Sequence, residues 1–463
     1  RMDNLESAYQ QALDYLYSFV DYSLTRAFRY SPEKFNLDRM RDLLCRLGDP
    51  HLQYPAVHVA GTKGKGSTAA MVASTLHASG YKTGFYTSPH LQEYTERIQI
   101  NGQEIARAEF VDLVERIKPH AAAVEQITTF ELTTAIAFLY FAEQKVDAAV
   151  IEVGLGGRLD ATNVLVDPLV SVITSLSYDH TAVLGNTLAE IAREKAGIIK
   201  PGRPVVLAPQ KDEARLTVEA IARERGAPLT LIGRDVFFAP WSRSLGGQTL
   251  LVWNSGEQQL VDEFVESGGR SDWEPVRLTI PLLGHHQVEN AATAYTTIMA
   301  IREAGLAVPD GAIHRGFASV SWPARFEVLR RTPPVIVDSA HNRDSALKLR
   351  LALDDYLPGV PVILLFGASE DKDVHGMFAE LLPRASGLIA TQSVHPRAAS
   401  PEMLVDLAHQ FGCPAHAVVP LEDAMRKALE LAGNHAAVVV AGSLFVAAAA
   451  RATWKEIFPS PIS

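Results

Sequence analysis

Short apolar runs alternate with helical stretches along most of this chain, and this alternation limits the possible folds more than any other feature of the sequence. The runs AVHVA, DAAVIEV, LVSVIT and RPVVLA are rich in β-branched residues and apolar on both faces, and helical patterns separate the first three. Strands of this kind are typical of a parallel sheet that helices cover on both sides. We therefore predict an α/β fold that begins with such a domain.

The alternation pauses and then restarts, which predicts a second domain. The first 50 residues read as two helices, and residues 232–280 predict a small antiparallel patch, followed by a helix in 287–305. Beyond SVSWPARFE the apolar runs resume, in PVIVDSAHN, PVILLFGASEDKD, GLIATQSVHPRA and HAAVVVAGSL. We expect an N-terminal domain over 1–318, a hinge over 319–324 and a Rossmann-like C-terminal α/β domain over 325–463.

Charge and cysteine usage exclude several classes of function. The net charge is −10 and the basic residues are scattered, whereas nucleic-acid binding calls for a basic stripe. Cys45 and Cys413 are far apart, so a disulfide framework or cysteine zinc site is not expected and a cytoplasmic location fits. We predict no signal peptide, because the first 20 residues lack a basic start and an apolar core. The apolar segment 436–450 is shorter than a membrane span and is interrupted by Gly442-Ser443.

A glycine-rich turn between a strand and a helix is the clearest sign of a ligand. In VHVAGTKGKGSTAAMVASTL the turn covers residues 61–66, and it does not match the common G-x-x-x-x-G-K-S/T spacing. Such a turn lets backbone N–H groups surround an anion, and the following helix adds partial positive charge. Crowding Lys63 and Lys65 among three glycines is costly without an anion, so we predict phosphate binding in which Lys65 reaches the terminal phosphates. Ser67 or Thr68 would cap the helix or contact magnesium.

In the first domain, polar residues that could take part in chemistry follow two further strands, and one more lies within a helix. Glu152 ends a buried strand before a Gly154-Leu155-Gly156-Gly157 loop, where a carboxylate can hold magnesium, although a solvent-facing glutamate is the alternative. Asp179 and His180 lie beyond another strand, and a lone histidine is more often structural. Lys195 lies in a helix that opens with a Thr187/Glu190 capping box, and periodicity alone favours a surface lysine there.

The second domain repeats the arrangement of polar loops after buried strands. VIVDSAHN places Asp338, His341 and Asn342 after one strand, and FGASEDKD places residues 371–373 after another. Each loop alone could be a solvated turn. Two such loops in one sheet suggest a shared active edge.

Taken together, these segments resemble the folylpolyglutamate synthase/dihydrofolate synthase family, within the Mur ligase superfamily. The matching segments span almost the whole chain in family order: GTKGKGS (61–67), TSPHL with ERIQING (87–102), TFE (129–131), IEVGLGGRLDATN (151–163), DHTAVLG (179–185), EKAGIIK (194–200), GHHQVENAATA (284–294), WPARFE (322–327), DSAHN (338–342), DKD (371–373), PRA (396–398) and GSLF (442–445). The family's own phosphate loop is G-T-x-G-K-x-S, which explains the unusual spacing. The resemblance implies a P-loop ATPase-type domain in 1–318 and a Mur ligase-type domain in 325–463.

The resemblance also implies a reaction and its participants. ATP phosphorylates a substrate carboxylate to an acyl phosphate, and the amine of L-glutamate displaces phosphate. The carboxylate belongs to a folate, to dihydropteroate or to both. The implied cofactors are ATP with two magnesium ions. Apart from the resemblance, we expect a cytoplasmic monomer that binds neither nucleic acid nor membrane.

Residue by residue, the family pattern assigns roles to side chains in both domains. It gives Lys65, Lys195 and His180 catalytic roles, with Lys195 carbamylated. The metal ligands would be Ser88, Glu152 and His180, and the folate contacts Thr129 and Phe130, although a core phenylalanine is the alternative at the latter. The ATP contacts would be Gly61, Thr62, Lys63, Gly64, Lys65, Gly66, Ser67, Thr68, Asn290, Arg325, Asp338 and His341.

Two departures from the family pattern and two other functions are weighed against this assignment. Lys63 stands where bacterial members often have Asn, and Ser339 replaces a glycine and would be strained if that position needed a positive φ. One alternative is a Mur-type amino acid ligase acting on another carboxylate, against which we count the short stretch of about 55 residues before the phosphate loop. The other is a non-ligating nucleotide-binding switch, which would hydrolyse ATP without an acceptor amine.

Overall fold

The computed structural model describes residues 2–19, 36–178 and 180–459, which form two compact units. The first unit comprises Arg1–Ala239, Leu250–Thr279 and His286–Val320, and the second comprises Pro240–Thr249, Ile280–His285 and Ser321–Ser463. The second unit thus includes two short segments that precede the C-terminal stretch. The predicted division into functional domains at 319–324 stays a prediction.

The first unit is built on an eight-stranded sheet with the order β4-β3-β2-β5-β1-β6-β7-β8. Six of the strands pair in parallel, and β3 pairs antiparallel with both β2 and the edge strand β4. The strands are β1 (Ala56–Ala60), β2 (Thr83–Tyr86), β3 (Ile98–Ile100), β4 (Gln103–Glu104), β5 (Ala148–Glu152), β6 (Val170–Ile173), β7 (Val205–Leu207) and β8 (Leu229–Leu231). Because β5 and β6 flank β1, the carboxyl end of β1 is a topological switch point, where open α/β sheets bind ligands.

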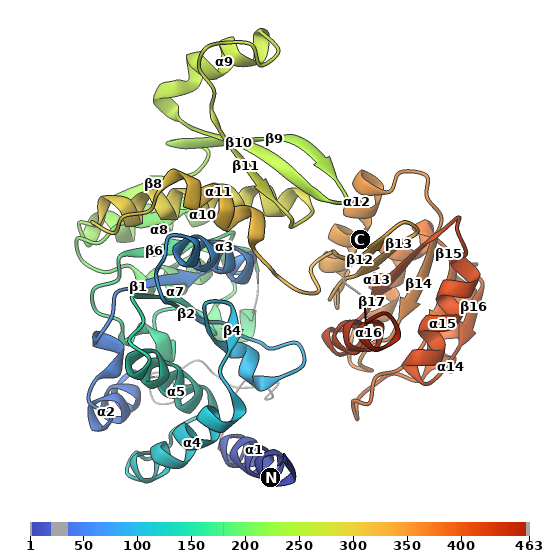
Figure 1. Ribbon diagram of the computed structural model, residues 1–463, viewed down its shortest axis with the longest axis horizontal. Coiled ribbons are helices and arrows are strands. Elements are labelled where there is room, and N and C mark those ends of the chain that lie inside the picture. Colours follow the sequence, from blue (N-terminus) through green and yellow to red (C-terminus); the bar gives the residue numbers. More distant parts are fainter. Residues whose placement is uncertain (1, 20–35, 179, 460–463) are drawn as a thin grey trace. The chain divides into compact units, whose positions relative to one another are not determined.

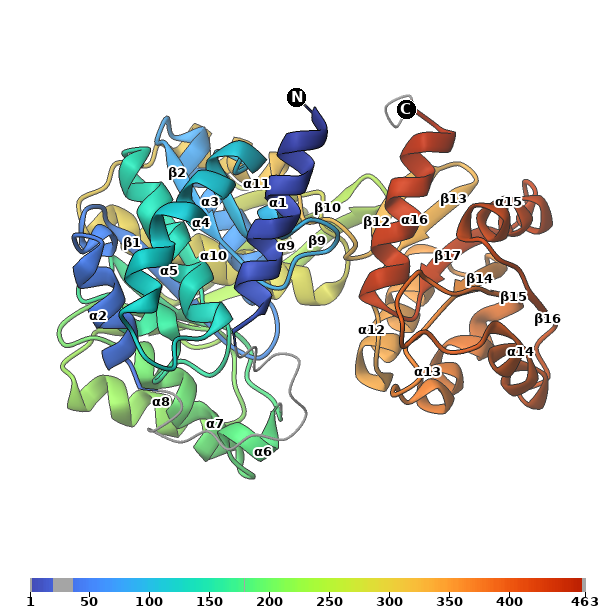
Figure 2. The ribbon, with the colours of Figure 1, turned by 90° about the horizontal axis from the view of Figure 1, so that it is seen from below.

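Helices cover both faces of this sheet, as the sequence pattern predicts (Figure 1, and Figure 2 from below). One face carries α3 (Lys65–Ala78), α10 (His285–Glu303) and α11 (Asp310–Ser319), and the other carries α4 (Arg107–Ala122) and α5 (Thr129–Glu143). The remaining helices are α1 (Met2–Tyr17), α2 (Asp38–Arg46), α6 (Thr181–Leu184), α7 (Leu188–Lys195), α8 (Asp212–Glu224) and α9 (Gln258–Glu266). All residues of β1 and β5 are buried, which is why both read as uninterrupted apolar runs.

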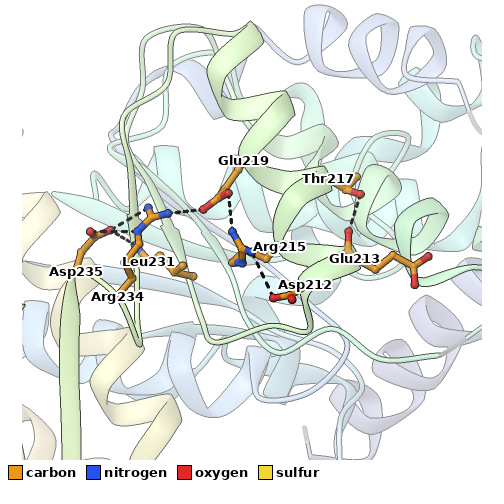
Figure 3. A network of polar contacts seen from close by, with 8 residues as sticks. All are labelled: Asp212, Glu213, Arg215, Thr217, Glu219, Leu231, Arg234 and Asp235. Carbon is orange, nitrogen blue, oxygen red and sulfur yellow. Dashed lines mark hydrogen bonds and ion pairs between the residues drawn. The ribbon is translucent and has the colours of Figure 1, made fainter.

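An ion network fastens α8 to the turn after β8 (Figure 3). Glu219 accepts from Arg215 at 3.0 Å and from Arg234 at 2.6 Å. Arg234 also pairs with Asp235, whose carboxylate accepts the Leu231 backbone N–H at 2.8 Å. Since Glu219 is only 13% exposed, this network stabilises the edge of the sheet more than an isolated surface pair would.

A three-stranded sheet of β9 (Val236–Ser244), β10 (Gly247–Asn254) and β11 (Val276–Ile280) fills the region predicted to hold short strands. Its hairpin tip, Pro240–Thr249, belongs to the second unit. There the buried Gln248 amide donates to the carbonyls of Leu282 and Gly284 at 2.8 Å each. The Tyr356 hydroxyl donates to the Gln248 oxygen at 3.0 Å and accepts the Gly284 N–H at 3.2 Å.

The second unit contains a six-stranded sheet with the order β12-β13-β17-β14-β15-β16, parallel except for β12. Its strands are β12 (Glu327–Arg331), β13 (Pro334–Val337), β14 (Val362–Phe366), β15 (Ala385–Ala390), β16 (Ala415–Ala417) and β17 (Ala437–Ala441). Its helices are α12 (Arg343–Tyr356), α13 (Val374–Leu381), α14 (Pro401–Gln410), α15 (Leu421–Ala432) and α16 (Leu444–Ile457). A core of α12, α13 and α14 against the sheet makes this the predicted Rossmann-like domain.

The structure confirms the strands that the sequence predicts in long apolar runs. Every apolar run named from the sequence contains a strand, from β1 to β17. The sequence pattern did not single out β2, β3, β4, β8, β12 or β16, which have two to five residues each and lie between the longer runs or at sheet edges. None of the described helices is long and apolar enough to cross a membrane.

Candidate active site

The glycine-rich turn lies at the carboxyl end of β1, directly beside the ends of β5 and β6. Val59 pairs with Glu152 and Ala60 pairs with Ile173, so the turn, Glu152 and the segment after β6 meet at one edge of the sheet. The backbone N–H groups of Thr62 and Lys63 both donate to the Ser175 carbonyl, at 3.0 and 3.1 Å. The turn is therefore held by the neighbouring strand rather than by contacts of its own.

Two glycines of the turn have no space for a side chain. Gly61 has a φ of +147°, and a Cβ there would lie 1.8 Å from the Thr174 hydroxyl oxygen. Gly64 has a φ of +83°, and a Cβ there would lie 2.2 Å from the side-chain oxygen of Asn290. Each position thus needs glycine for both its backbone conformation and its packing.

The N-terminus of α3 is open. The helix begins at Lys65 and no side chain of the described residues caps it, so the N–H groups of its first turn are available to an anion. The predicted cap by Ser67 or Thr68 is wrong: Ser67 accepts from the Gln287 amide at 3.1 Å. The buried Thr68 hydroxyl has no hydrogen-bond partner within the described part of the chain. Asn290, from α10, is held in place by its own bond to Gln287 at 3.0 Å.

Two lysine ammonium groups lie at this edge of the sheet, one from the turn itself and one from α7. Lys65 donates to the carbonyl of Val153, just after β5, at 3.2 Å. Lys195 donates to the carbonyl of Gly61 at 2.9 Å and is 1% exposed. The interpretation of Lys195 as a surface lysine is therefore wrong, because α7 ends against the turn and buries its last residue.

Glu152 is buried at the end of β5, which contradicts the solvent-facing alternative. Its carboxylate accepts a short hydrogen bond from the Thr87 hydroxyl. Thr87 directly precedes Ser88, so the second predicted metal ligand lies on the adjacent loop. His180, the third, is exposed and stands in the left-handed region at the start of α6, with a φ of +42°. Asp179 lies outside the described residues.

A chain of buried hydrogen bonds that the sequence did not reveal fixes the loop after Glu152. The Asp160 carboxylate accepts the N–H groups of Gly154 and Leu155 at 3.1 and 2.9 Å, and also the Thr162 hydroxyl. That hydroxyl lies 2.8 Å from His58 Nε2, so the histidine carries its proton there. Burial, followed by the charge of Lys200, lowers the pKa of His58 to about 3, and burial raises the pKa of Asp160.

The predicted folate residues lie at the start of α5. Thr129 is buried and its hydroxyl donates to the Leu16 carbonyl at 2.7 Å, which favours a structural role for that side chain. Phe130 is only partly buried and stacks on Tyr86, with ring centroids 6.1 Å apart and planes at 26°. It also packs against Gly154, where a Cβ would lie 2.4 Å from the ring. Phe130 thus connects α5 with the loop that follows Glu152.

In the second unit, Asp338 organises the turn after β13. Its two carboxylate oxygens accept the N–H groups of Phe326 and Ala340, each at 2.8 Å. Burial raises the pKa of Asp338, and the Arg325 guanidinium acts in the opposite direction. Arg325 lies between Ala324 and Phe326, which have φ values of +58° and +46°. Such backbone strain is found where the surrounding structure fixes a side chain for a purpose.

His341 and Ser339 complete this turn. The Nδ1 atom of His341 donates to the Ser339 carbonyl at 3.0 Å, which leaves Nε2 without a proton. Burial lowers the pKa of His341, so its ring is held neutral. Ser339 is not among the residues with positive φ, so serine in place of the family's glycine brings no backbone strain. Of the residues in 371–373, Asp373 caps α13 by accepting the Gly376 N–H at 2.8 Å.

The family comparisons agree with this geometry. The Mur ligase middle domain matches residues 59–298, and the Mur ligase glutamate ligase domain matches residues 324–444. The chain therefore has the catalytic architecture of a Mur ligase.

Three relatives define the branch of that superfamily. The Bacillus subtilis dihydrofolate synthase/folylpolyglutamate synthase is 35% identical over 92% of this chain and 97% of its own. The folylpolyglutamate synthase structure from Thermotoga maritima has a TM-score of 0.82 and 33% identity, covering 97% of this chain and 99% of that one. The Mycobacterium tuberculosis folylpolyglutamate synthase complexed with ADP has a TM-score of 0.80 and 32% identity, covering 99% and 100%. The chain belongs to the folylpolyglutamate synthase/dihydrofolate synthase family.

Proposed function

We propose that this protein is an ATP-dependent ligase that joins L-glutamate to the carboxylate of a folate, through an acyl phosphate. The observation that carries the proposal is the convergence of Lys65, Lys195 and the uncapped start of α3 on one turn, beside the buried carboxylate of Glu152. The ADP bound in the mycobacterial relative supports a nucleotide at this turn. Dihydropteroate, a folate monoglutamate or both serve as the acceptor.

The chemistry requires positive charge where phosphate is transferred. A carboxylate oxygen of the folate attacks the γ-phosphorus of ATP, ADP leaves, and the acyl phosphate carries the former carboxylate oxygen as its bridge. The amine of glutamate then attacks the acyl carbon, the C–O bond breaks, and phosphate departs with that oxygen. Lys65 and the N–H groups of α3 stabilise the transferring phosphoryl group, which is where such enzymes obtain most of their rate.

Magnesium fits the donors at this edge. Glu152 offers a buried carboxylate and Ser88 a hydroxyl, and magnesium in proteins prefers oxygen ligands completed by water and substrate phosphates. No group of three or more His, Cys, Asp and Glu side chains that could hold a metal occurs in the described ranges, so phosphates and water would supply most of its coordination. We propose two magnesium ions, with Ser88, Glu152 and His180 as ligands. Bound there, magnesium would neutralise charge on the phosphates.

Lys195 is proposed to act as a carbamate. A buried amine is costly to keep charged, and its neutral form can add carbon dioxide to become an anion. Replacing Lys195 by Ala should abolish ligation, and added small carboxylates should restore part of it. Activity equal to that of the parent protein would contradict this role.

The remaining assignments concern the nucleotide and the cell. We propose that Asn290, Arg325, Asp338 and His341 bind ATP. The strained backbone on both sides of Arg325 supports this, because it fixes where the guanidinium points. We propose a monomer working in the cytoplasm, which is compatible with two free cysteines, one exposed and one buried.

The test is a product analysis with ATP and magnesium, with and without L-glutamate, using dihydropteroate and tetrahydrofolate in parallel. A product heavier by one glutamyl residue, with phosphate release that requires glutamate, is expected. If another carboxylate substrate is extended instead, the protein is a Mur-type ligase of different specificity. Phosphate release indifferent to both partners would identify a nucleotide-binding switch and contradict the proposal.

A further inference from the structure

Arg97 is a partly buried arginine that forms no ion pair with any carboxylate in the part of the chain that the structure describes. It ends the short helical turn Tyr94–Arg97 that leads into β3. Its Nε donates to Nδ1 of His90 at 2.9 Å, and its guanidinium lies over the Tyr94 ring, 4.8 Å from the centroid. Neither partner carries a negative charge, so no anion neutralises the guanidinium in the described part of the chain.

The contacts of Arg97 also fix which part of the guanidinium remains available. Tyr94 covers one face of the planar group and His90 occupies Nε, which leaves the edge formed by the two terminal nitrogens. That edge presents parallel N–H bonds in the geometry that matches a carboxylate. Tyr94 is itself fixed, since it is 4% exposed and its hydroxyl bonds the Thr133 hydroxyl. The guanidinium is therefore held in place before any ligand arrives.

Arg107 shows what a compensated arginine looks like in the same neighbourhood. It also lies over a tyrosine ring, that of Tyr9, at 4.4 Å from the centroid. Unlike Arg97, it pairs with two carboxylates, Glu6 and Glu93. The ring contact is common to both arginines, so the missing carboxylate is the feature that sets Arg97 apart.

The location of Arg97 indicates which anion would pair with its guanidinium. Its carbonyl accepts the Thr87 N–H at 3.0 Å, and Thr87 bonds the Glu152 carboxylate. The next residue, Ile98, pairs with Tyr86, on which Phe130 stacks. Through these contacts, one residue separates Arg97 from Glu152 at the proposed phosphoryl-transfer edge, and two separate it from the proposed folate contact Phe130.

We propose that Arg97, oriented by His90 and Tyr94, binds the α-carboxylate of the terminal glutamyl residue of a folate substrate. In that residue only the α-carbon and two methylene groups separate the α-carboxylate from the γ-carboxylate that is activated. A ligand with its γ-carboxylate at the phosphoryl-transfer edge therefore carries a second carboxylate close by. Dihydropteroate has no such second carboxylate, so Arg97 distinguishes the two acceptor classes. This inference rests on the proposed function.

The test compares Arg97→Gln and Arg97→Lys with the parent protein on three ligands: tetrahydrofolate monoglutamate, its α-carboxamide analogue and dihydropteroate. Arg97→Gln should raise KM for the monoglutamate about 10- to 100-fold with little change in kcat, the loss expected for a charge-assisted hydrogen-bonded pair. Arg97→Lys should recover part of it, because it keeps the charge but not the paired N–H bonds. The α-carboxamide should already bind weakly to the parent protein, and Arg97→Gln should weaken it no further. Dihydropteroate should be unaffected.

Two controls separate this role from a structural one. Arg107→Gln removes a neighbouring arginine over a tyrosine and should leave all three KM values unchanged, and thermal unfolding of each variant reports on the fold. Equilibrium binding of the same ligands without ATP or glutamate measures the contact even if no product forms. Loss of all three ligands to the same extent, or an unchanged monoglutamate affinity, would overturn the proposal. A parent protein that binds the monoglutamate through Arg97 but attaches no glutamate would overturn only the proposed function.

Discussion

The two α/β units use the same position, the end of a buried parallel strand, in opposite ways. After β1 the turn has glycines at φ values of +147° and +83°, and it leads into a helix whose first N–H groups no side chain caps. After β13 the N–H groups of the turn donate within the protein. That of Ser339 donates to the Ala324 carbonyl and that of Ala340 to the Asp338 carboxylate. In the first turn the N–H groups of Thr62 and Lys63 are likewise used, on the Ser175 carbonyl, but those at the start of α3 have no side-chain cap among the described residues. The first turn therefore offers the start of a helix to an anion, whereas the second uses a carboxylate to position side chains.

The largest effect should come from closing the open turn. Gly64→Ala places a Cβ against Asn290 at a left-handed φ, which costs about 1–2 kcal/mol before the clash is counted. Displacing the turn should lower glutamate-dependent ATP turnover about 10³-fold. The measurement is steady-state phosphate release with the folate acceptor present.

A matched control is available for that glycine. Gly202 has a φ of +70°, and nothing lies within 4 Å of a Cβ added there. Gly202→Ala carries the same backbone strain without a clash and lies away from the turn. It should retain the parent turnover, and an equal loss in both variants would show that general destabilisation, not the turn, is responsible.

A smaller effect is expected where the carboxylate holds the second turn. Asp338→Ala leaves the N–H groups of Phe326 and Ala340 without their acceptor, which should lower the free energy of unfolding by about 2–3 kcal/mol. Urea unfolding of the variant measures this. Glu370→Ala, at an exposed carboxylate in a neighbouring loop, should change it by no more than about 0.5 kcal/mol. Equal stability of the two variants would contradict the anchoring role of Asp338.

Sequence pattern predicted the positions of residues but not the contacts between distant segments. The turn at 61–66 and Glu152 could be located because glycines, lysines and strand ends leave local signals. The burial of Lys195 could not, since it depends on α7 ending against Gly61, a residue far away in the chain. The same holds for Asp160, whose role depends on its bonds to the loop at Gly154, and for Arg97, whose significance lies in a missing partner. Periodicity records which face of an element is buried, not what it meets.

The smallest expected effect is a loss of stability at low pH, and it distinguishes the two units because they differ in their buried histidines. Among the described residues, the two buried histidines, His51 and His58, both lie in the first unit. Burial lowers the pKa of each, that of His58 from 6.5 to about 3. Because the folded value lies below the unfolded one, this stabilisation is complete above pH 6.5 and is lost as the pH falls toward 3.

At pH 5.5 the loss from His58 alone should reach about 1.4 kcal/mol. Urea unfolding between pH 7.5 and 5.5 measures it, and His58→Gln should make the dependence shallower by that amount. An identical pH dependence in the variant would show that His58 has the same protonation state in the folded and the unfolded protein, which would contradict this prediction.

The most direct test of the account follows an oxygen atom. The folate acceptor is prepared with ¹⁸O in the carboxylate that receives glutamate, and the phosphate released in one round of ligation is analysed by mass. An acyl phosphate formed at the turn after β1 predicts one ¹⁸O in each phosphate molecule and one glutamyl residue added to each folate. Phosphate without ¹⁸O, which has gained its fourth oxygen from solvent, would mean that water, not the folate carboxylate, attacks ATP, and would contradict the proposed reaction.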